Sequence, residues 1–321
     1  MRLPTVTLSF TLFTLTGVLG APATSHHDHH PHTPAPLQAV LSRWSSDPRS
    51  RYPTDLTRDI SPKPLHSHND YWRRVPLLTG LSTGAISTEA DIWLSPDSSL
   101  LIGHHPSSLT PNRTLNTLYL TPLLEILDTM NPPTPSPPET PNGVFDSAPG
   151  QTLYLFLDLK STSPLLFPLV LDALKPLREN DYLSYYANGA YHRRPVTVIG
   201  TGAMPMDKVV EMHPRYVFYD FPLDRLVREP ELEVEKGVVG MASTSLRMVV
   251  GEVRGVEGMD KEQVETVRAL VGEARKRGWG VRFWDTPGWP GSRRRGVWRQ
   301  LVEAGVRLVS VDEVEEAAWE L

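Results

Sequence analysis

The alternation of short β-rich runs with helical patterns, from about residue 60 onward, constrains the fold of this chain most strongly. Such an alternation is the signature of a parallel sheet built from βα units. Eight candidate strands follow one another along the chain. The first is weak and ends near Leu65, and the other seven are 85–94, 152–160, 195–200, 216–221, 238–245, 280–285 and 307–311. Eight such units in about 260 residues predict an α/β protein of the (β/α)8 TIM-barrel class. A doubly wound open sheet is the alternative, but no G-x-G-x-x-G follows any candidate strand to support it.

Helical patterns occupy the intervals between these strands. They are predicted at 118–130, 165–178, 206–212, 261–277 and 296–304. In segment 261–277, apolar residues recur at helical spacing while charged residues take the other face. One stretch, 131–149, breaks the alternation because its many prolines cannot donate the backbone hydrogen bonds of a helix or strand. We expect it to be a loop insertion in the barrel domain, either a tolerated surface insertion or a docking segment for a proline-recognising partner.

The N-terminal region has the pattern of a secretory signal peptide. Arg2 precedes an apolar run to Leu19, and the small residues Gly20 and Ala21 follow it. An uncleaved membrane anchor is the alternative, but threonines interrupt the run, which is barely long enough to span a bilayer. We expect a signal peptide at 1–21, a disordered His/Pro-rich spacer at 22–58 and the barrel domain at 59–321. The five histidines of residues 26–32 could bind a transition metal weakly, although such a spacer lacks the fixed geometry of a catalytic site.

Composition excludes several classes of function. The chain has no cysteine, so neither a Cys nucleophile nor a Cys-ligated zinc site can exist. Its net charge of −5, from 32 Lys and Arg against 37 Asp and Glu, argues against binding to a nucleic-acid backbone. We therefore expect a secreted monomer without a stable transmembrane anchor, stabilised by a large barrel core and not by disulfides. Asn112 begins the glycosylation sequon Asn-Arg-Thr, which fits export.

Titratable residues gather where the first strands end. His66 and His68 follow the first strand, Glu89 and Asp91 lie two apart on the second, and His104 follows soon after; Asp158 and Lys160 end the next strand. Residues two apart on a strand point to the same face, and in a barrel these strand ends meet at its mouth. Buried carboxylates without partners would cost several kcal/mol, so their recurrence at successive strand ends favours a functional site.

These residue types suit phosphodiester cleavage assisted by a metal ion. Glu89, Asp91 and Asp158 make an oxygen-rich pocket suited to Mg²⁺ or Ca²⁺, which would stabilise charge on a phosphate. Two histidines near neutral pKa can supply a general acid and a general base. Lys160 would add a fixed positive charge beside the same phosphate. The attacking group could be water or a hydroxyl of the substrate, which would release a cyclic phosphate.

Taken together, these motifs resemble the superfamily of glycerophosphodiester phosphodiesterases and phosphatidylinositol phospholipase C-like barrels. His68 precedes Glu89 by 21 residues and His104 follows Glu89 by 15, close to the compact arrangement of sphingomyelinase D-like members. Four segments resemble the fungal altered inheritance of mitochondria protein 6 family more closely: His66-Ser67-His68-Asn69-Asp70-Tyr71-Trp72, Glu89-Ala90-Asp91-Ile92-Trp93, Val281-Arg282-Phe283-Trp284-Asp285-Thr286-Pro287 and Val309-Ser310-Val311-Asp312-Glu313. The resemblance covers about Pro64 to Asp312. The N-terminus is poor in arginine, unlike a mitochondrial transit peptide.

The resemblance implies a role for each matching residue. Glu89, Asp91 and Asp158 would bind the metal, and Lys160 would contact phosphate. His68 and His104 would be the catalytic histidines. His66 is the alternative to His68 for its role, or would contact the substrate. Trp284 would form either an aromatic wall for the substrate or a plug of the barrel core. Two departures are that the Arg after the first His is absent, and that His105 stands where an Asp often follows the second His.

The sequence thus predicts a phosphodiesterase acting on a phosphodiester or phospholipid. The alternative is a catalytically silent secreted barrel that binds a phospholipid or glycan. A metal-dependent isomerase or amidohydrolase on the same barrel would need further histidines at strand ends, and the later strands offer none.

Overall fold

The computed structural model describes residues 33–50, 52, 54–229 and 231–321. The chain divides into two compact units, residues 1–51 and 52–321, and each is described by itself. The predicted signal peptide and the histidines of residues 26–32 lie outside the described residues. In the described chain, no helix is both long enough and apolar enough to cross a bilayer.

The first unit contains the helix α1 (Ala35–Trp44) and the short 3₁₀ helix η1 (Pro48–Ser50). Our expectation of a spacer without structure over 22–58 therefore differs from the structure at 35–44, where apolar residues recur at helical spacing. The barrel unit also begins earlier than residue 59. Thr57, at the end of η2 (Asp55–Thr57), is buried and donates a hydrogen bond of 2.7 Å to the carbonyl of Val144.

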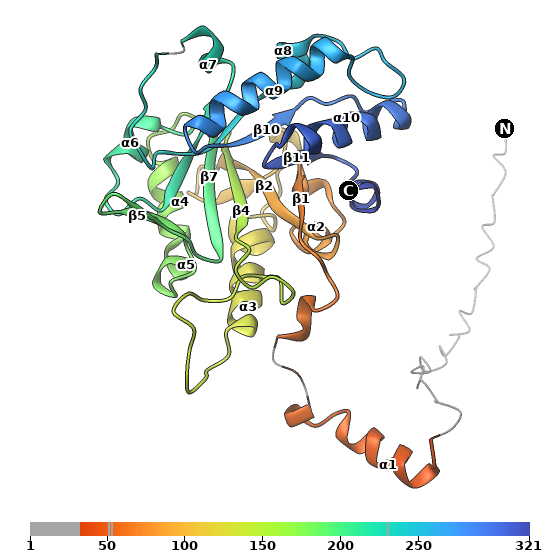
Figure 1. Ribbon diagram of the computed structural model, residues 1–321. Helices are drawn as coiled ribbons and strands as arrows, with labels where there is room; N and C mark the ends of the chain where they lie inside the picture. The colour runs from red at the N-terminus through yellow and green to blue at the C-terminus, as the bar shows by residue number, and fades with distance from the viewer. Residues whose placement is uncertain (1–32, 51, 53, 230) are drawn as a thin grey trace, which may run out of the picture. The chain divides into compact units, whose positions relative to one another are not determined.

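Eight parallel strands close into a barrel, which confirms the predicted fold class (Figure 1). In chain order they are β1 (Lys63–Ser67), β2 (Ala85–Leu94), β4 (Leu153–Leu159), β7 (Val196–Gly202), β8 (Val217–Pro222), β9 (Val239–Ser245), β10 (Gly280–Trp284) and β11 (Leu308–Val311). Each pairs with the next in this order, and the sheet closes because β1 pairs with both β2 and β11. The carboxyl ends of all eight strands therefore meet at one end of the barrel.

Helices follow most of the strands. They are α2 (Leu78–Ser82), the π-helical turn η5 (Asn116–Leu120), α3 (Thr121–Met130), α4 (Leu166–Ala173), α5 (Lys175–Glu179), α6 (Met206–Glu211), α7 (Arg225–Arg228), α8 (Leu246–Val250), α9 (Lys261–Lys276), α10 (Gly291–Ala304) and α11 (Val314–Glu320). The predicted helix 165–178 is divided at Leu174, because Pro176 has no N–H for a continuous helical ladder. Helix α10 begins five residues before the predicted start at Gly296.

Two short antiparallel elements were not predicted. Strand β3 (Leu100–Ile102) folds back on the end of β2. Strands β5 (Tyr185–Ala187) and β6 (Ala190–His192) form a hairpin around Asn188 and Gly189, which both have positive φ. An Asn-Gly pair is a strong hairpin signal, so the sequence did carry this information.

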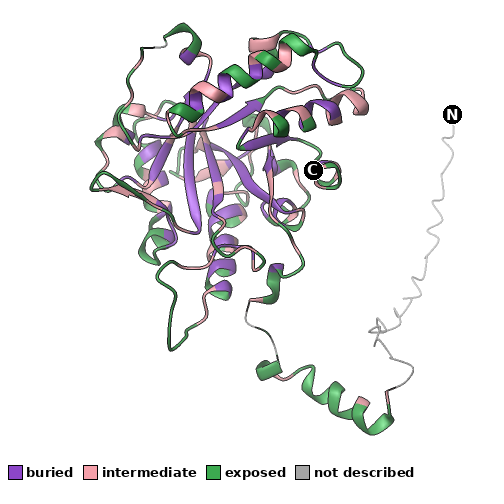
Figure 2. Ribbon diagram, viewed as in Figure 1, coloured by how far each residue is buried: buried purple, intermediate pink, exposed green. Residues whose placement is uncertain are grey.

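The apolar faces of strands and helices make one continuous core, and Figure 2 shows the strands as mostly buried. The loop 131–149 contains no helix or strand in the described chain. Its base is held together by hydrogen bonds between Asn131 and Asn142, and Val144 and Phe145 anchor its end in the core. The loop is therefore attached to the barrel at both ends.

Candidate active site

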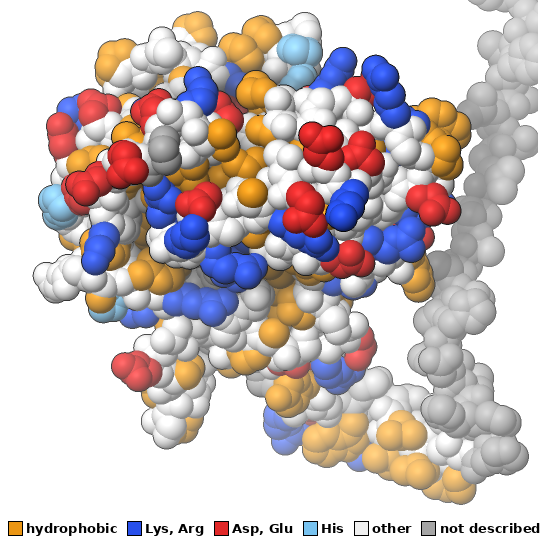
Figure 3. Space-filling view, turned by 45° about the horizontal axis from the view of Figure 1, so that its top comes forward, with side chains coloured by type: hydrophobic (Ala, Val, Ile, Leu, Met, Phe, Trp, Pro, Cys, Tyr) orange, Lys and Arg blue, Asp and Glu red, His pale blue; other side chains and the backbone are white. Residues whose placement is uncertain are grey.

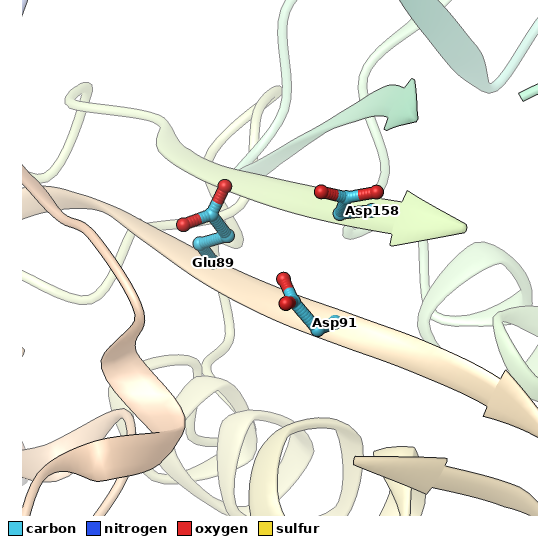
Figure 4. Close-up of side chains that lie close together, drawn as sticks. All are labelled: Glu89, Asp91 and Asp158. Carbon is cyan, nitrogen blue, oxygen red and sulfur yellow. The ribbon is translucent and has the colours of Figure 1, made fainter. Parts of the chain in front are cut away.

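Three carboxylates converge at the carboxyl ends of two neighbouring strands (Figure 4). Glu89 and Asp91 lie on one face of β2, and Asp91 is the register neighbour of Asp158 on β4. One oxygen from each of the three lies within 4.8 Å of the others. Glu89 and Asp91 are almost completely buried, while Asp158 is half-buried. The predicted juxtaposition of these residues is therefore present in the structure.

Lys160 partly neutralises this cluster. Its Nζ lies 2.6 Å from Asp158 Oδ2 and 3.0 Å from Asp91 Oδ2. Burial would lower the pKa of Lys160, but the two carboxylates outweigh it and raise that pKa. Burial, followed by repulsion from Glu89, raises the pKa of Asp91 to about 6 despite the attraction of Lys160. Asp91 is therefore a carboxylate that is costly to ionise unless further positive charge is nearby.

The donor set fits a hard divalent cation. Carboxylate oxygens are the ligands that Mg²⁺ and Ca²⁺ prefer, and the cluster supplies three of them from two rigid strands. Asp158 Oδ1 is also buried without a hydrogen-bond partner among the described residues, which leaves an acceptor to be satisfied. Glu89, Asp91 and Asp158 are thus the residues that could hold such a cation.

His68 stands beside Glu89 at the mouth of the barrel. Its Nδ1 lies 2.9 Å from Asp312 Oδ1 and its Nε2 lies 3.7 Å from Glu89 Oε2. The next residue, Asn69, has a left-handed backbone with φ of 49°, and its N–H donates to Glu89 Oε2 at 3.0 Å. Burial would lower the pKa of His68, but the hydrogen bond to Asp312 and the charge of Glu89 raise it above its usual value. The side chain is 28% exposed, so a ligand can reach it.

His104 stands beside the other carboxylate of β2. Its Nδ1 lies 3.4 Å from Asp91 Oδ2 and 3.0 Å from the hydroxyl of Tyr71, which donates to Asp91 at 2.7 Å. No role was predicted for Tyr71, although it belongs to the motif after the first strand. The histidine is 37% exposed, and the ring of Trp72 packs edge-on against it with centroids 5.2 Å apart. Tyr71 thus holds Nδ1 of His104, and the ring of His105 packs edge-on against His104 with centroids 4.4 Å apart.

The structure corrects the role predicted for His66. This side chain is fully buried, with Nδ1 2.7 Å from Ser87 Oγ and Nε2 2.9 Å from Arg282. Burial and the charge of Arg282 lower its pKa to about 4, so the ring is neutral near neutral pH. A side chain enclosed in this way cannot contact substrate. His68, and not His66, is the histidine that faces the mouth from the loop after β1.

Arg282 on β10 was not predicted as a site residue, although it lies in one of the four segments that carry the resemblance. It is buried beneath the cluster, 3.7 Å from Glu89 Oε1 and 3.4 Å from Asp220 Oδ2, and its guanidinium stacks over Phe156. Burial would raise the pKa of Glu89, but His66, His68 and Arg282 hold it well below its usual range. Glu89 is therefore an anion at neutral pH. An arginine in the middle of a predicted barrel strand was the available signal, because such a residue needs a buried partner.

The remaining predicted residues lie apart from the cluster. Trp284 ends β10 next to Ser245 of β9 and is 39% exposed, so it is a partly exposed residue at the end of its strand and not a plug of the core. Asn112 is exposed in a turn after His105, as a glycosylation site requires. A cavity of about 970 Å³ lies at the amino ends of the strands, lined by Tyr154, Phe218 and Trp279, and it includes none of the site residues.

Comparison with known proteins finds a family model and several relatives that match this chain. Residues 54–220 match the family model of the AIM6-like phosphodiesterase domain. The chain is 43% identical over 293 residues to "Altered inheritance of mitochondria protein 6 homolog" of Arthroderma benhamiae, covering 88% of this chain and 91% of that protein. It is 37% identical over 282 residues to "Altered inheritance of mitochondria protein 6" of Eremothecium gossypii, covering 84% and 72%.

Solved structures of similar architecture include a glycerophosphodiester phosphodiesterase from Agrobacterium tumefaciens, at a TM-score of 0.43 and 14% identity over 81% of this chain and 99% of that one. A putative glycerophosphodiester phosphodiesterase from Galdieria sulphuraria matches at a TM-score of 0.43 and 13% identity, covering 81% and 97%.

Proposed function

This chain belongs to the family of AIM6-like phosphodiesterase domains, and from that premise we propose that it is a metal-dependent phosphoric diester hydrolase with His68 and His104 as its acid–base pair. One observation carries the proposal. Two partly exposed histidines lie beside different members of a cluster of three carboxylates. A phosphodiester bound over the cluster would have one imidazole near each of the two carboxylates of β2. This is the arrangement that general acid–base cleavage of a phosphodiester requires.

Each protein group has a distinct part in the proposed reaction. A cation held by Glu89, Asp91 and Asp158 would neutralise charge that develops on the phosphate oxygens. Asp312 keeps the proton of His68 on Nδ1 and favours its imidazolium form, which suits His68 to protonate the leaving alcohol. His104, whose Nδ1 is oriented by Tyr71, accepts the proton of the attacking hydroxyl through its other nitrogen.

The experiment is an assay of the purified protein on glycerophosphodiesters, lysophospholipids and phosphoinositides, with Mg²⁺, Ca²⁺ or EDTA. We expect turnover that requires a divalent cation and falls at least about a hundredfold in both His68→Ala and His104→Ala. Phosphorus NMR of the products separates attack by water from release of a cyclic phosphate. Absence of cation-dependent turnover on all of these substrates would overturn the proposal.

A catalytically silent, ligand-binding barrel is the second candidate, and the position of Lys160 favours it. This ammonium group already bridges two of the three carboxylates, so the cluster is partly neutralised by the protein itself. The same assay decides between the two. Lipid binding that is equal in the parent protein and in His104→Ala, without any turnover, would establish the silent barrel.

We also propose that the protein is exported. The apolar N-terminal run supports this, as does the exposure of Asn112 in its sequon. Secreted protein should lose mass on treatment with an endoglycosidase, and Asn112→Gln should abolish that shift. Retention of the unmodified protein inside the cell would contradict export.

A further inference from the structure

Large apolar side chains are exposed in the segments that follow the barrel strands. Five of them form what we call the apolar rim, and they come after β1, β4, β8, β9 and β10: Trp72, Leu165, Val227, Met248 and Trp289. Each is between 58 and 82% exposed. Exposed single apolar residues are ordinary, but five on separate loops of one barrel end call for an explanation.

The topology places this rim around the candidate site. Because the eight strands are parallel, the segments after them lie at the same end as the carboxylate cluster. Trp72 is directly at the site, packed against His104. Helices α7 and α8, which carry Val227 and Met248, lie at the top of Figure 1, and Figure 3 brings this side forward, with hydrophobic side chains exposed between charged ones along its upper edge.

Cations accompany the rim residues in the sequence. Arg74 follows Trp72 by two residues, and Arg247 precedes Met248. Both arginines are exposed and make no ion pair with any residue that the structure describes. The acidic side chains of the α7 segment are engaged instead, Asp224 with Arg228 and Glu229 with Arg225. Arg74 and Arg247 are therefore available to anionic groups, whereas Asp285, an exposed acid of a rim loop without an ion pair in the described chain, accepts a hydrogen bond from Ser245.

We propose that the apolar rim docks this barrel onto an anionic lipid surface. The inference rests on the proposed function and deepens it, because it names the substrate class as a phosphodiester lipid held in a bilayer. Apolar and tryptophan side chains enter the interface between head groups and acyl chains, while arginines attract anionic head groups. Anchors carried on five separate loops match a fluid surface better than a folded partner, which needs a contiguous and complementary patch. Docking would bring the mouth beside His104 to the level of the lipid phosphates.

Vesicle binding tests the proposal. The full-length protein is sedimented with vesicles of phosphatidylcholine alone and of equimolar phosphatidylcholine and phosphatidylserine. We expect binding to the anionic vesicles that weakens with salt, with a loss of about tenfold in Met248→Ser and in Trp289→Ser, the double variant losing more. Arg247→Glu should weaken binding to anionic vesicles by roughly fivefold or more. The matched controls are Trp44→Ser on α1 and Trp319→Ser on α11, which change exposed tryptophans. Trp319 lies away from the rim, because the carbonyl of the preceding Ala318 accepts a hydrogen bond from Lys63 at the amino end of β1.

The outcomes separate docking from catalysis. If Met248→Ser cleaves the soluble glycerophosphocholine as the parent does but loses vesicle binding and hydrolysis of vesicle lipid, docking by the rim is supported. Vesicle binding that depends on the rim without any turnover supports docking and rejects the proposed hydrolase. Turnover of the soluble diester without vesicle binding rejects docking and leaves the hydrolase intact. Equal losses in the rim variants and in Trp44→Ser or Trp319→Ser would also overturn docking by the rim.

Discussion

His68 Nδ1 lies 2.9 Å from Asp312 Oδ1, so a histidine that follows the first barrel strand is paired with an aspartate that follows the last. The two are 244 residues apart in the chain. They meet because β1 pairs with β11, with Ser67 opposite Val311. Closure of the barrel therefore brings His68 and Asp312 together. A variant that weakens the pairing of β1 with β11 should change the chemistry of His68 more than it changes the distant core.

Asp312→Asn tests the orienting role of this carboxylate. The amide is nearly isosteric but does not fix the Nδ1 proton of His68 or stabilise its imidazolium form, so we expect kcat to fall by about a hundredfold, with KM changed little. The measurement is a pH profile of kcat and of kcat/KM on a soluble phosphodiester. The limb that reports His68 should move to lower pH. A profile that keeps its shape, with only KM raised, would show that Asp312 binds substrate instead.

The same pair predicts how stability depends on pH. Burial would lower the pKa of His68, but Asp312 and Glu89 raise it; the resulting stabilisation is complete below the usual pKa of 6.5 and is lost as pH rises through the folded-state value. Burial would raise the pKa of Asp312, but His68 holds it down, so its contribution is present above 3.8 and is lost as pH falls. The pair should therefore stabilise the fold most between these two values, as measured by urea unfolding in EDTA.

A variant isolates this contribution from the rest of the protein. Subtracting the unfolding free energy of Asp312→Asn from that of the parent at each pH should give a bell-shaped difference. A difference that does not vary with pH would show that the pair is too exposed to contribute.

The barrel strands could be predicted because their pattern is local. Each is a short apolar run bounded by turn residues, and segment 85–94 was placed with both ends as the structure has them. The predicted strands 152–160 and 238–245 differ from β4 and β9 only by a residue at their ends. Helix α1 was not predicted because the surrounding prolines and histidines suggested a disordered spacer. No residue of this helix is buried, so its apolar residues gave no sign of belonging to a packed core.

The site could be predicted only in part. Glu89, Asp91 and Asp158 lie two apart or on adjacent strands, so periodicity alone brings them together. Asp312 and Arg282 reach the cluster from the other end of the chain, and their partners depend on which strands pair when the barrel closes. The choice between His66 and His68 depended on depth in the barrel, because both rings lie within 4 Å of Glu89 Oε2. His66 is on β1 and fully buried, while His68 follows the strand and is partly exposed at the mouth.

Cation binding can be measured without an assay of activity. If Glu89, Asp91 and Asp158 hold a divalent cation, Mg²⁺ or Ca²⁺ at about 100 times its Kd should add about 2.7 kcal/mol to the free energy of unfolding. This stabilisation should appear as a rise in Tm when the cation is added, and Asp158→Asn should abolish that rise. Asp146→Asn, which changes an aspartate outside the cluster, should retain it. A rise of the same size in Asp158→Asn would place the cation elsewhere.

Arg282 contributes to the stability of the site as the cation shared by two buried carboxylates. Its guanidinium lies between Glu89 and Asp220, and all three side chains are buried. Arg282→Met would leave two carboxylates without their shared cation, so we expect the free energy of unfolding to fall by about 3 to 5 kcal/mol. Burial already raises the pKa of Asp220 to about 6 against the attraction of Arg282, so neutralising that residue should recover part of the loss. Urea unfolding at pH 7 of Arg282→Met and of Arg282→Met with Asp220→Asn measures both effects. If the double variant is no more stable than the single one, the cost of Arg282→Met comes from lost packing against Phe156 and not from unpaired charge.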